Sequence, residues 1–276
     1  MPPPARPLPR RILVPIPVDE ASWDALTLAA SMAKALRAEI RGLFVEDLDA
    51  LAAASLPFTR VIAFQSGRLG ALEVTQVEAA FRAQASRARQ RLGAFCERQA
   101  VAWSFEVANR QALTAVEPEE AADTNDAGRA APARGLLLLD RRALRPARQA
   151  TALLRLAQSH SDAVAIWDTM ARSPMQVVLV YRGDSANLEL AAHLAQAMDI
   201  PLRILVNEAS PDATANLVHG AREWLDTHRV HATLQELAKT DPARFRQSLA
   251  SLERALIVIE RVDLMTILAD AAATTG

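Results

Sequence analysis

The sequence has few of the features that assign a chain to a class at once. One cysteine among 276 residues excludes a disulfide framework and fits a reducing compartment, so we expect a cytoplasmic protein. No apolar run approaches the roughly 18 residues that a membrane span needs. The opening MPPPARPLPRR has charges but no apolar stretch behind them, so we expect an extended arm over residues 1–10 and no secretory signal.

Charge of one sign and aromatic side chains are also scarce. The formal net charge is −1, so no overall field attracts nucleic acid or acidic membranes, and we expect neither as a partner. Aromatic residues make up 4% of the chain, whereas apolar residues make up 51%. Alanine and leucine dominate, which favours helices packed on a sheet over an all-β design.

Apolar runs of strand length alternate with segments of helical periodicity along the whole chain. In the first half this predicts strands at 12–18, 40–45, 101–107, 135–140 and 163–167, and helices at 21–37, 72–99 and about 149–159. In the second half it predicts strands at 175–181, 202–207, 231–237 and 255–260, and helices at 185–198, 210–228 and from about 241. Ser210 and Pro211 predict a helix start capped by the serine. The alternation predicts an α/β fold with a parallel sheet and helices on both faces.

The two halves are similar in sequence. LAASMAKAL at 28–36 aligns without a gap with LAAHLAQAM at 190–198, and GLLLLDRR at 135–142 aligns with ALIVIERV at 255–262. Such a repeat predicts two α/β units, at 11–170 and 174–276. We expect the second unit to be truncated, because the residues of this sequence after Glu260 could form one short helix but hardly a fifth strand as well. The fifth strand of the first unit is then a candidate to cover the open edge, which would pair the two units within one chain.

The segment 11–47, RILVPIPVDEASWDALTLAASMAKALRAEIRGLFVED, resembles the opening of a universal stress protein domain, and LLLLDRR resembles its fourth strand. The resemblance covers nearly the whole chain, as a tandem of two such units. It implies open, Rossmann-like sheets with strand order 3-2-1-4-5, related to the adenine-nucleotide α-hydrolases. It also implies pairing of units through their last strands, so a homodimer is a further expectation. In some members it implies ATP at the carboxyl ends of strands one, two and four.

Carried over by position, this resemblance marks a small set of residues that would contact a nucleotide. They are Asp19, Val45, Arg141 and Arg142 in the first unit, and Gly183 and Asp184 in the second. Members that bind ATP carry two spaced glycines after strand four, followed by a Gly-Ser or Gly-Thr pair. The matching stretches 141–151 and 261–270 have no glycine. Glycine lets backbone amides approach an anion closely, and arginine replaces the charge without that geometry.

Two interpretations of the arginines after the fourth strand therefore stay open. They form a solvated turn, or they form an anion site of bidentate guanidinium groups. Cys96 lies on the apolar side of its helix and is expected in the core. The long insertion 47–71 is expected to lie over the end of the sheet, with a flap for a partner or a cover over a small ligand as the alternative.

Two functions from different classes follow from these observations. The first is a non-enzymatic stress-response or regulatory protein that binds a protein partner or a small ligand, with no catalytic residue, no metal and no cofactor. The alternative is an adenine-nucleotide-binding protein, at most a weak ATPase, with ATP held at one site at the carboxyl ends of the strands.

Overall fold

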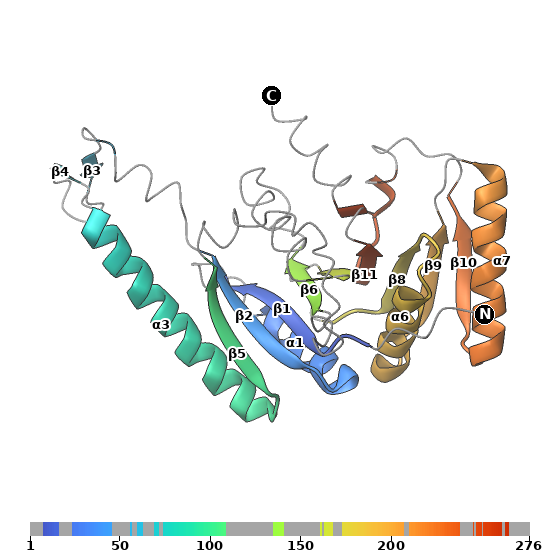
Figure 1. Cartoon of the computed structure of the whole chain (residues 1–276), viewed down its shortest axis with the longest axis horizontal. Coiled ribbons are helices and arrows are strands. Elements are labelled where there is room, and N and C mark those ends of the chain that lie inside the picture. The colour runs from blue at the N-terminus through green and yellow to red at the C-terminus, as the bar shows by residue number, and fades with distance from the viewer. Residues whose placement is uncertain are drawn as a thin grey trace, which may run out of the picture.

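The fold is a long, mostly parallel sheet with helices packed on it (Figure 1). The structure is a computed structural model. It describes residues 8–16, 24–45, 56, 60–62, 69–71, 74–108, 135–140, 161, 163–167, 173–206, 210–237, 245, 247–249, 251–260 and 263–264. Nine strands make the main sheet in the order β10-β9-β8-β11-β7-β6-β1-β2-β5. None of the helices in these segments is both long enough and apolar enough to cross a membrane.

The first unit contributes five strands that all run parallel. They are β1 (Arg11–Ile16), β2 (Glu39–Val45), β5 (Trp103–Ala108), β6 (Gly135–Asp140) and β7 (Ala163–Trp167). Their order in the sheet is β5-β2-β1-β6-β7, which is the order 3-2-1-4-5 within the unit. The predicted strand order is therefore confirmed. The predicted strand 12–18 is described only as far as Ile16.

The second unit repeats this order with four strands. They are β8 (Gln176–Tyr181), β9 (Leu202–Val206), β10 (Ala232–Glu236) and β11 (Ala255–Glu260), arranged as β10-β9-β8-β11. The place of the fifth strand is taken by β7, which pairs antiparallel with β11. The prediction that the first unit covers this edge is confirmed. All five residues of β7 are buried, because the strand lies between the two units.

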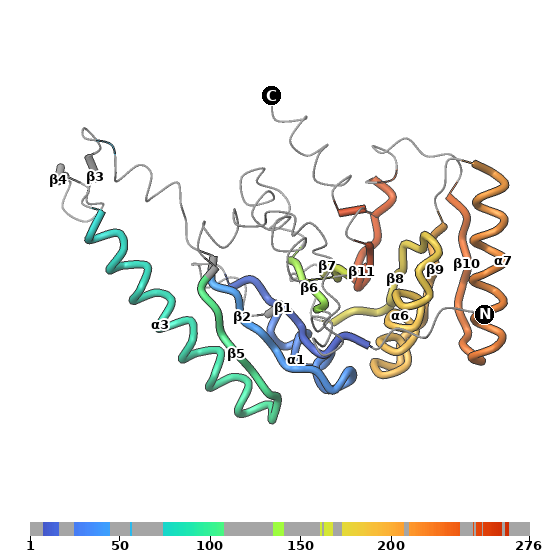
Figure 2. Tube along the Cα trace, in the orientation of Figure 1, coloured from blue at the N-terminus to red at the C-terminus, as the bar shows by residue number. Residues whose placement is uncertain are grey.

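Within the described residues, four helices cover one face of this sheet. They are α1 (Asp24–Leu36), α3 (Val74–Gln99), α6 (Ser185–Met198) and α7 (Pro211–His228). Their buried residues form one cluster with every second residue of the strands, among them Ile12, Leu136 and Leu179. The alternation follows from the pleat of a strand, which sends successive side chains to opposite faces. Figure 2 shows α3 and α7 at opposite ends of the sheet, with α1 and α6 between them.

The corresponding helices α1 and α6 pack against each other where the two units meet. The ring of His193 on α6 forms a hydrogen bond of 3.0 Å through Nε2 with the backbone oxygen of Ala35 on α1. The two units therefore share both a sheet and a helix contact.

The opposite face of the sheet carries a second apolar cluster. It contains Leu13 and Leu137 from the first unit and Val178 and Ile257 from the second. Side chains that follow β10 and β11 in the chain complete this cluster: Phe245, Leu249 and Leu264. Both faces of the central strands are thus buried, which explains why these strands are almost continuously apolar.

One local prediction is wrong, and another concerns a segment that lies mostly outside the described residues. Ser210 precedes α7 with an extended backbone, but its side chain makes no capping hydrogen bond, so the predicted serine cap is wrong. In the insertion 47–71, β3 (Arg60–Ile62) and β4 (Leu69–Ala71) pair with each other in a separate antiparallel sheet. Figure 1 draws this hairpin at the N-terminal end of α3. The rest of the insertion, apart from residue 56, lies outside the described residues.

Candidate functional site

In an open parallel sheet, ligands bind at the carboxyl ends of the strands, where the strand order changes direction. In the second unit this point lies between β8 and β11, which are neighbours in the sheet. The turn from Arg182 to Asp184 leaves β8 here and leads into α6. Gly183 and Asp184, two of the residues marked by the sequence, lie in this turn.

The geometry of the turn explains why glycine stands at position 183 and aspartate at position 184. Gly183 has φ +103°, a conformation that L-residues rarely adopt, so glycine is required for the chain to turn here. Asp184 has an extended backbone and caps α6, because its Oδ1 accepts a hydrogen bond of 3.0 Å from the backbone nitrogen of Ala186. A carboxylate therefore already occupies part of the helix N-terminus that could otherwise receive an anion.

A partly buried ion pair lies beside this turn. Arg182 donates from Nε to Oδ1 of Asp263 over 2.6 Å, and Asp263 is completely buried. Asp263 follows β11, whereas Arg182 follows β8. The pair therefore ties the chain after β11 to the turn after β8.

Glu260, the last residue of β11, adds a further carboxyl group to this region. Burial raises its pKa, and the negative charges of Asp263 and Asp184 raise it further. Arg182 and a side-chain hydrogen bond from Asn187 act in the opposite direction without cancelling these effects. Tyr181, the last residue of β8, is also buried, and its pKa is raised by burial and then by Asp184 and Glu260. These shifts have the signs expected for acids that lose water and face like charges.

We name these side chains the β8–β11 acid cluster; it consists of Tyr181, Arg182, Asp184, Asn187, Glu260 and Asp263. Its carboxyl groups outnumber its one guanidinium group, so when they are ionised they repel a phosphate. In the described residues no group of three or more histidine, cysteine or acidic side chains is arranged to hold a metal ion.

The first unit is described less fully at the corresponding place. Val45 ends β2 and Asp140 ends β6, as expected from the sequence. Asp19, Arg141 and Arg142 lie outside the described residues, so their predicted role stays a prediction.

Sequence reasoning missed several members of the acid cluster. A sequence pattern could have marked Glu260, because the fourth strand of each unit ends in an acid followed by arginine. Asp263 lies in the stretch noted only for its lack of glycine. Nothing in the sequence pairs Asp263 with Arg182, because 81 positions separate the two residues.

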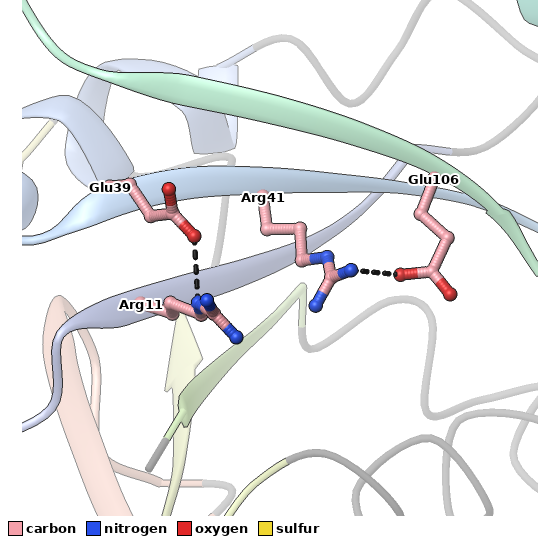
Figure 3. Close-up of polar contacts among 4 residues, drawn as sticks. All are labelled: Arg11, Glu39, Arg41 and Glu106. Atoms are coloured by element: carbon pink, nitrogen blue, oxygen red, sulfur yellow. Dashed lines mark ion pairs between the residues drawn. The ribbon is translucent and has the colours of Figure 1, made fainter. Parts of the chain in front are cut away.

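Charged pairs also lie on the sheet itself, and they reflect the repeat. Figure 3 shows Arg11 paired with Glu39 over 2.7 Å and Arg41 paired with Glu106 over 2.8 Å. Arg41 lies opposite Ser104 in the register and reaches two residues further along β5 to Glu106. In the second unit Arg203 reaches in the same diagonal way across to Gln235 of β10. Because this cross-strand contact recurs in both units, we infer that it stabilises the sheet.

The fold thus defines a doubly wound α/β protein with an internal repeat. No protein-family model and no curated protein matches the chain. Among solved structures, it is similar to a universal stress protein from Archaeoglobus fulgidus, with TM-score 0.55, 13% identity, and coverage of 96% of this chain and 93% of that chain. A functionally unknown protein from Pseudomonas aeruginosa gives TM-score 0.51 at 12% identity, covering 96% of this chain and 98% of that one.

These comparisons establish the fold. The chain has the fold of the universal stress proteins, as the resemblance of its sequence implied. At this level of identity the similarity concerns the fold alone, and activity has to be argued from the site.

Proposed function

We propose that this protein is a non-enzymatic regulatory protein of the universal stress type that acts by binding a protein partner or a small ligand. The observation that carries the proposal is the β8–β11 acid cluster. It lies at the carboxyl ends of β8 and β11, the end of an open parallel sheet at which ligands generally bind, and it brings several carboxyl groups there.

Two physical arguments support this proposal. A triphosphate brings several negative charges, and partly buried carboxylates such as Asp184, Asp263 and ionised Glu260 would repel them strongly. The backbone amide of Ala186 is already engaged by Asp184, which removes one of the donors that a phosphate uses at a helix N-terminus. The absence of glycine from residues 261–270 argues in the same direction.

Thermal unfolding with and without millimolar Mg·ATP tests the proposal, with AMP and GTP as controls. A ligand present at about 100 times its dissociation constant adds about 2.7 kcal/mol to the free energy of unfolding. We expect no ATP-specific increase in Tm. A clear ATP-specific increase would contradict the proposal and would favour the alternative, an adenine-nucleotide site.

Two variants would then show which unit holds the nucleotide site. If ATP raised the Tm and the effect persisted in Gly183→Ala but vanished in a variant with Arg141 and Arg142 changed to Ala, the first unit would hold the nucleotide. Loss of the effect only in Gly183→Ala would place it in the second unit.

A further inference from the structure

The strand β5 lies at one edge of the main sheet, and its outer side is directed away from every other strand. It pairs with β2, and within the described residues no strand lies on its other side. The backbone nitrogen of Ile40 donates to the backbone oxygen of Ala102 over 2.9 Å, so in this parallel ladder the alternate residues Ser104 and Glu106 bond to β2. The outward-directed N–H and C=O groups therefore belong to the other residues of the strand, Trp103, Phe105 and Val107.

This edge has none of the usual protection against strand addition. Proline, lysine or a bulge commonly blocks such an edge. The strand WSFEVA contains neither residue, and its register with β2 is unbroken. Its one charged side chain, Glu106, pairs inward, with Oε2 2.8 Å from Nη2 of Arg41 (Figure 3). Val107 is 41% exposed. The edge is therefore open to a further strand.

The helix α3 brings positive charge beside this edge. Figure 1 draws α3 alongside β5, and the two run in opposite directions, joined by residues 100–102. Gly93 shows which side of α3 faces β5, because a Cβ there would lie 2.6 Å from Cζ2 of Trp103. Arg89 and Arg82 precede Gly93 by four and eleven residues, so they lie on the same side of the helix. Both arginines are exposed.

The two arginines extend along most of the length of the edge. From Gly93 to Arg82 the helix advances by about 16 Å, and a strand of the length of β5 is about 20 Å long. The acids on α3 are Glu78, which lies 3.8 Å from Arg82, and Glu97, which lies beyond Gly93 toward the start of β5. Arg89 makes no ion pair with any described residue. The middle of the edge therefore has an unopposed positive charge.

The two faces of a strand added to β5 would meet different surroundings. Trp103 and Phe105 pack against the apolar cluster on the helix side of the sheet, so Glu106 lies on the opposite face. An added strand would direct every second side chain toward the helix side, where Arg82 and Arg89 lie. Its other side chains would lie beside Glu106, where a negative charge is repelled.

We propose that this surface, the β5–α3 edge formed by the outer side of β5 together with Arg82 and Arg89, binds an extended acidic peptide of a partner protein as a tenth strand. Hydrogen bonds to the outward-directed backbone groups of β5 hold the peptide, and alternate side chains give specificity. The matching peptide carries acids at every second position and neutral residues between them. This inference rests on the proposed binding function and names the class of partner.

Fluorescence anisotropy with the full-length protein tests the proposal. The probe is a fluorescein-labelled peptide of about ten residues in which glutamate and valine alternate, and the matched probe has lysine in place of glutamate. We expect saturable binding of the first probe, weakened by salt, and no binding of the second. Two further peptides are N-methylated at every valine or at every glutamate. Since an added strand offers one edge to β5, one of these two peptides should lose binding and the other should keep it.

Two charge-reversal variants locate the site on α3. Changing Arg82 and Arg89 together to Glu should weaken binding by more than about tenfold. Changing Arg87 and Arg98 together to Glu makes the same change of charge on the other side of the helix, since these residues lie six positions before and five after Gly93. This control should leave the affinity within about twofold of the wild type, because exposed charges at a distance are screened.

Two variants of Val107 test the strand pairing. Val107→Pro removes an outward N–H group without removing a hydrogen bond to β2, so binding should weaken by about tenfold. Val107→Thr keeps the N–H group and the branched shape, and it should bind like the wild type. Circular dichroism establishes that both variants fold. If Val107→Pro does not fold, the pair of N-methylated peptides carries this part of the test.

Several results would overturn the proposal. Absence of binding to the wild type is one, and equal binding of the two N-methylated peptides is another. A third is equally tight binding of an oligonucleotide of about ten thymidines that Val107→Pro leaves unchanged, since charge alone would then explain attraction to α3. Binding that appears only when Glu119 and Glu120 are changed to Gln would assign the edge to the acidic stretch of the chain itself. Dimerisation lost in Val107→Pro would assign the edge to a second copy.

Failure of this inference is distinguishable from failure of the proposed function. The ATP experiment concerns the β8–β11 acid cluster, whereas the peptide experiment concerns the β5–α3 edge at one end of the sheet. Loss of peptide binding with no ATP-specific increase in Tm would reject the edge as the binding surface and leave the proposed function standing. An ATP-specific increase in Tm would contradict the proposed function whatever the peptide does.

Discussion

At the scale of single residues, two glycines of the second unit have opposite roles. Gly183 has φ +103°, and a Cβ there would lie 3.1 Å from Cδ2 of Leu217. Gly220 lies within α7, and a Cβ there meets nothing within 4 Å. The same substitution should therefore have opposite effects at the two positions.

We expect Gly183→Ala to lower the free energy of unfolding by about 1–3 kcal/mol, the usual cost of a strained backbone conformation. Gly220→Ala should raise it by about 0.5–1 kcal/mol, because alanine favours a helix interior over glycine. Urea denaturation of both variants measures the difference. Equal effects at the two positions would show that the turn conformation at Gly183 is not strained for alanine.

The single cysteine leads to a second prediction at this scale. Cys96 is fully buried on α3, as the sequence predicted, and burial together with the charge of Glu97 raises its pKa to about 11. The thiolate is the reactive form, so at about pH 8 the thiol should be inert in the folded protein. We expect Ellman's reagent to react only after denaturant is added. Rapid reaction of the native protein would mean that α3 opens readily from the sheet.

At the scale of elements, the two helix starts of the second unit differ in a way that can be measured. Asp184 caps α6 through its side chain, whereas Ser210 before α7 makes no such bond. We expect Asp184→Ala to cost about 1 kcal/mol of stability and Ser210→Ala to cost clearly less. Thermal and urea unfolding measure both. A larger loss of stability in Ser210→Ala than in Asp184→Ala would show that the serine side chain caps α7 after all, as the sequence predicted.

At the scale of the whole molecule, the second unit depends on the first. Its fourth strand, β11, has β8 on one side and β7 of the first unit on the other. Without β7, the apolar strand β11 becomes a sheet edge, and such edges are prone to aggregation. The repeat is therefore one folded body with a shared strand.

A truncation tests this dependence. Residues 173–276 expressed alone should be insoluble or lack a cooperative unfolding transition, as judged by circular dichroism. A matched full-length chain carrying Val164→Asp, which places a charge in the middle of β7, should lose stability in both units together. A soluble, cooperatively folding fragment 173–276 would show that the second unit is independent of β7.

Much of the fold could be predicted from the sequence, because strands and helices follow from local patterns. The run GLLLLD and its counterpart ALIVIE form the strands β6 and β11 with the predicted bounds, and the predicted helix at 185–198 is α6. The strand order came with the resemblance to a known family. The site was predicted only in part, since Gly183 and Asp184 lie in the turn after β8 while the predicted residues Asp19, Arg141 and Arg142 lie outside the described part of the chain.

By itself, the sequence determined the elements and their repeat, since apolar periodicity is a property of neighbouring residues and needs no partner. The tertiary structure decided which distant residues meet. The antiparallel pairing of β7 with β11, and the contact of Arg182 with Asp263, join residues that are about 80 or more positions apart. Local pattern carries no information about such pairs, because their energy arises only when the folded chain buries both groups together and excludes water from between them.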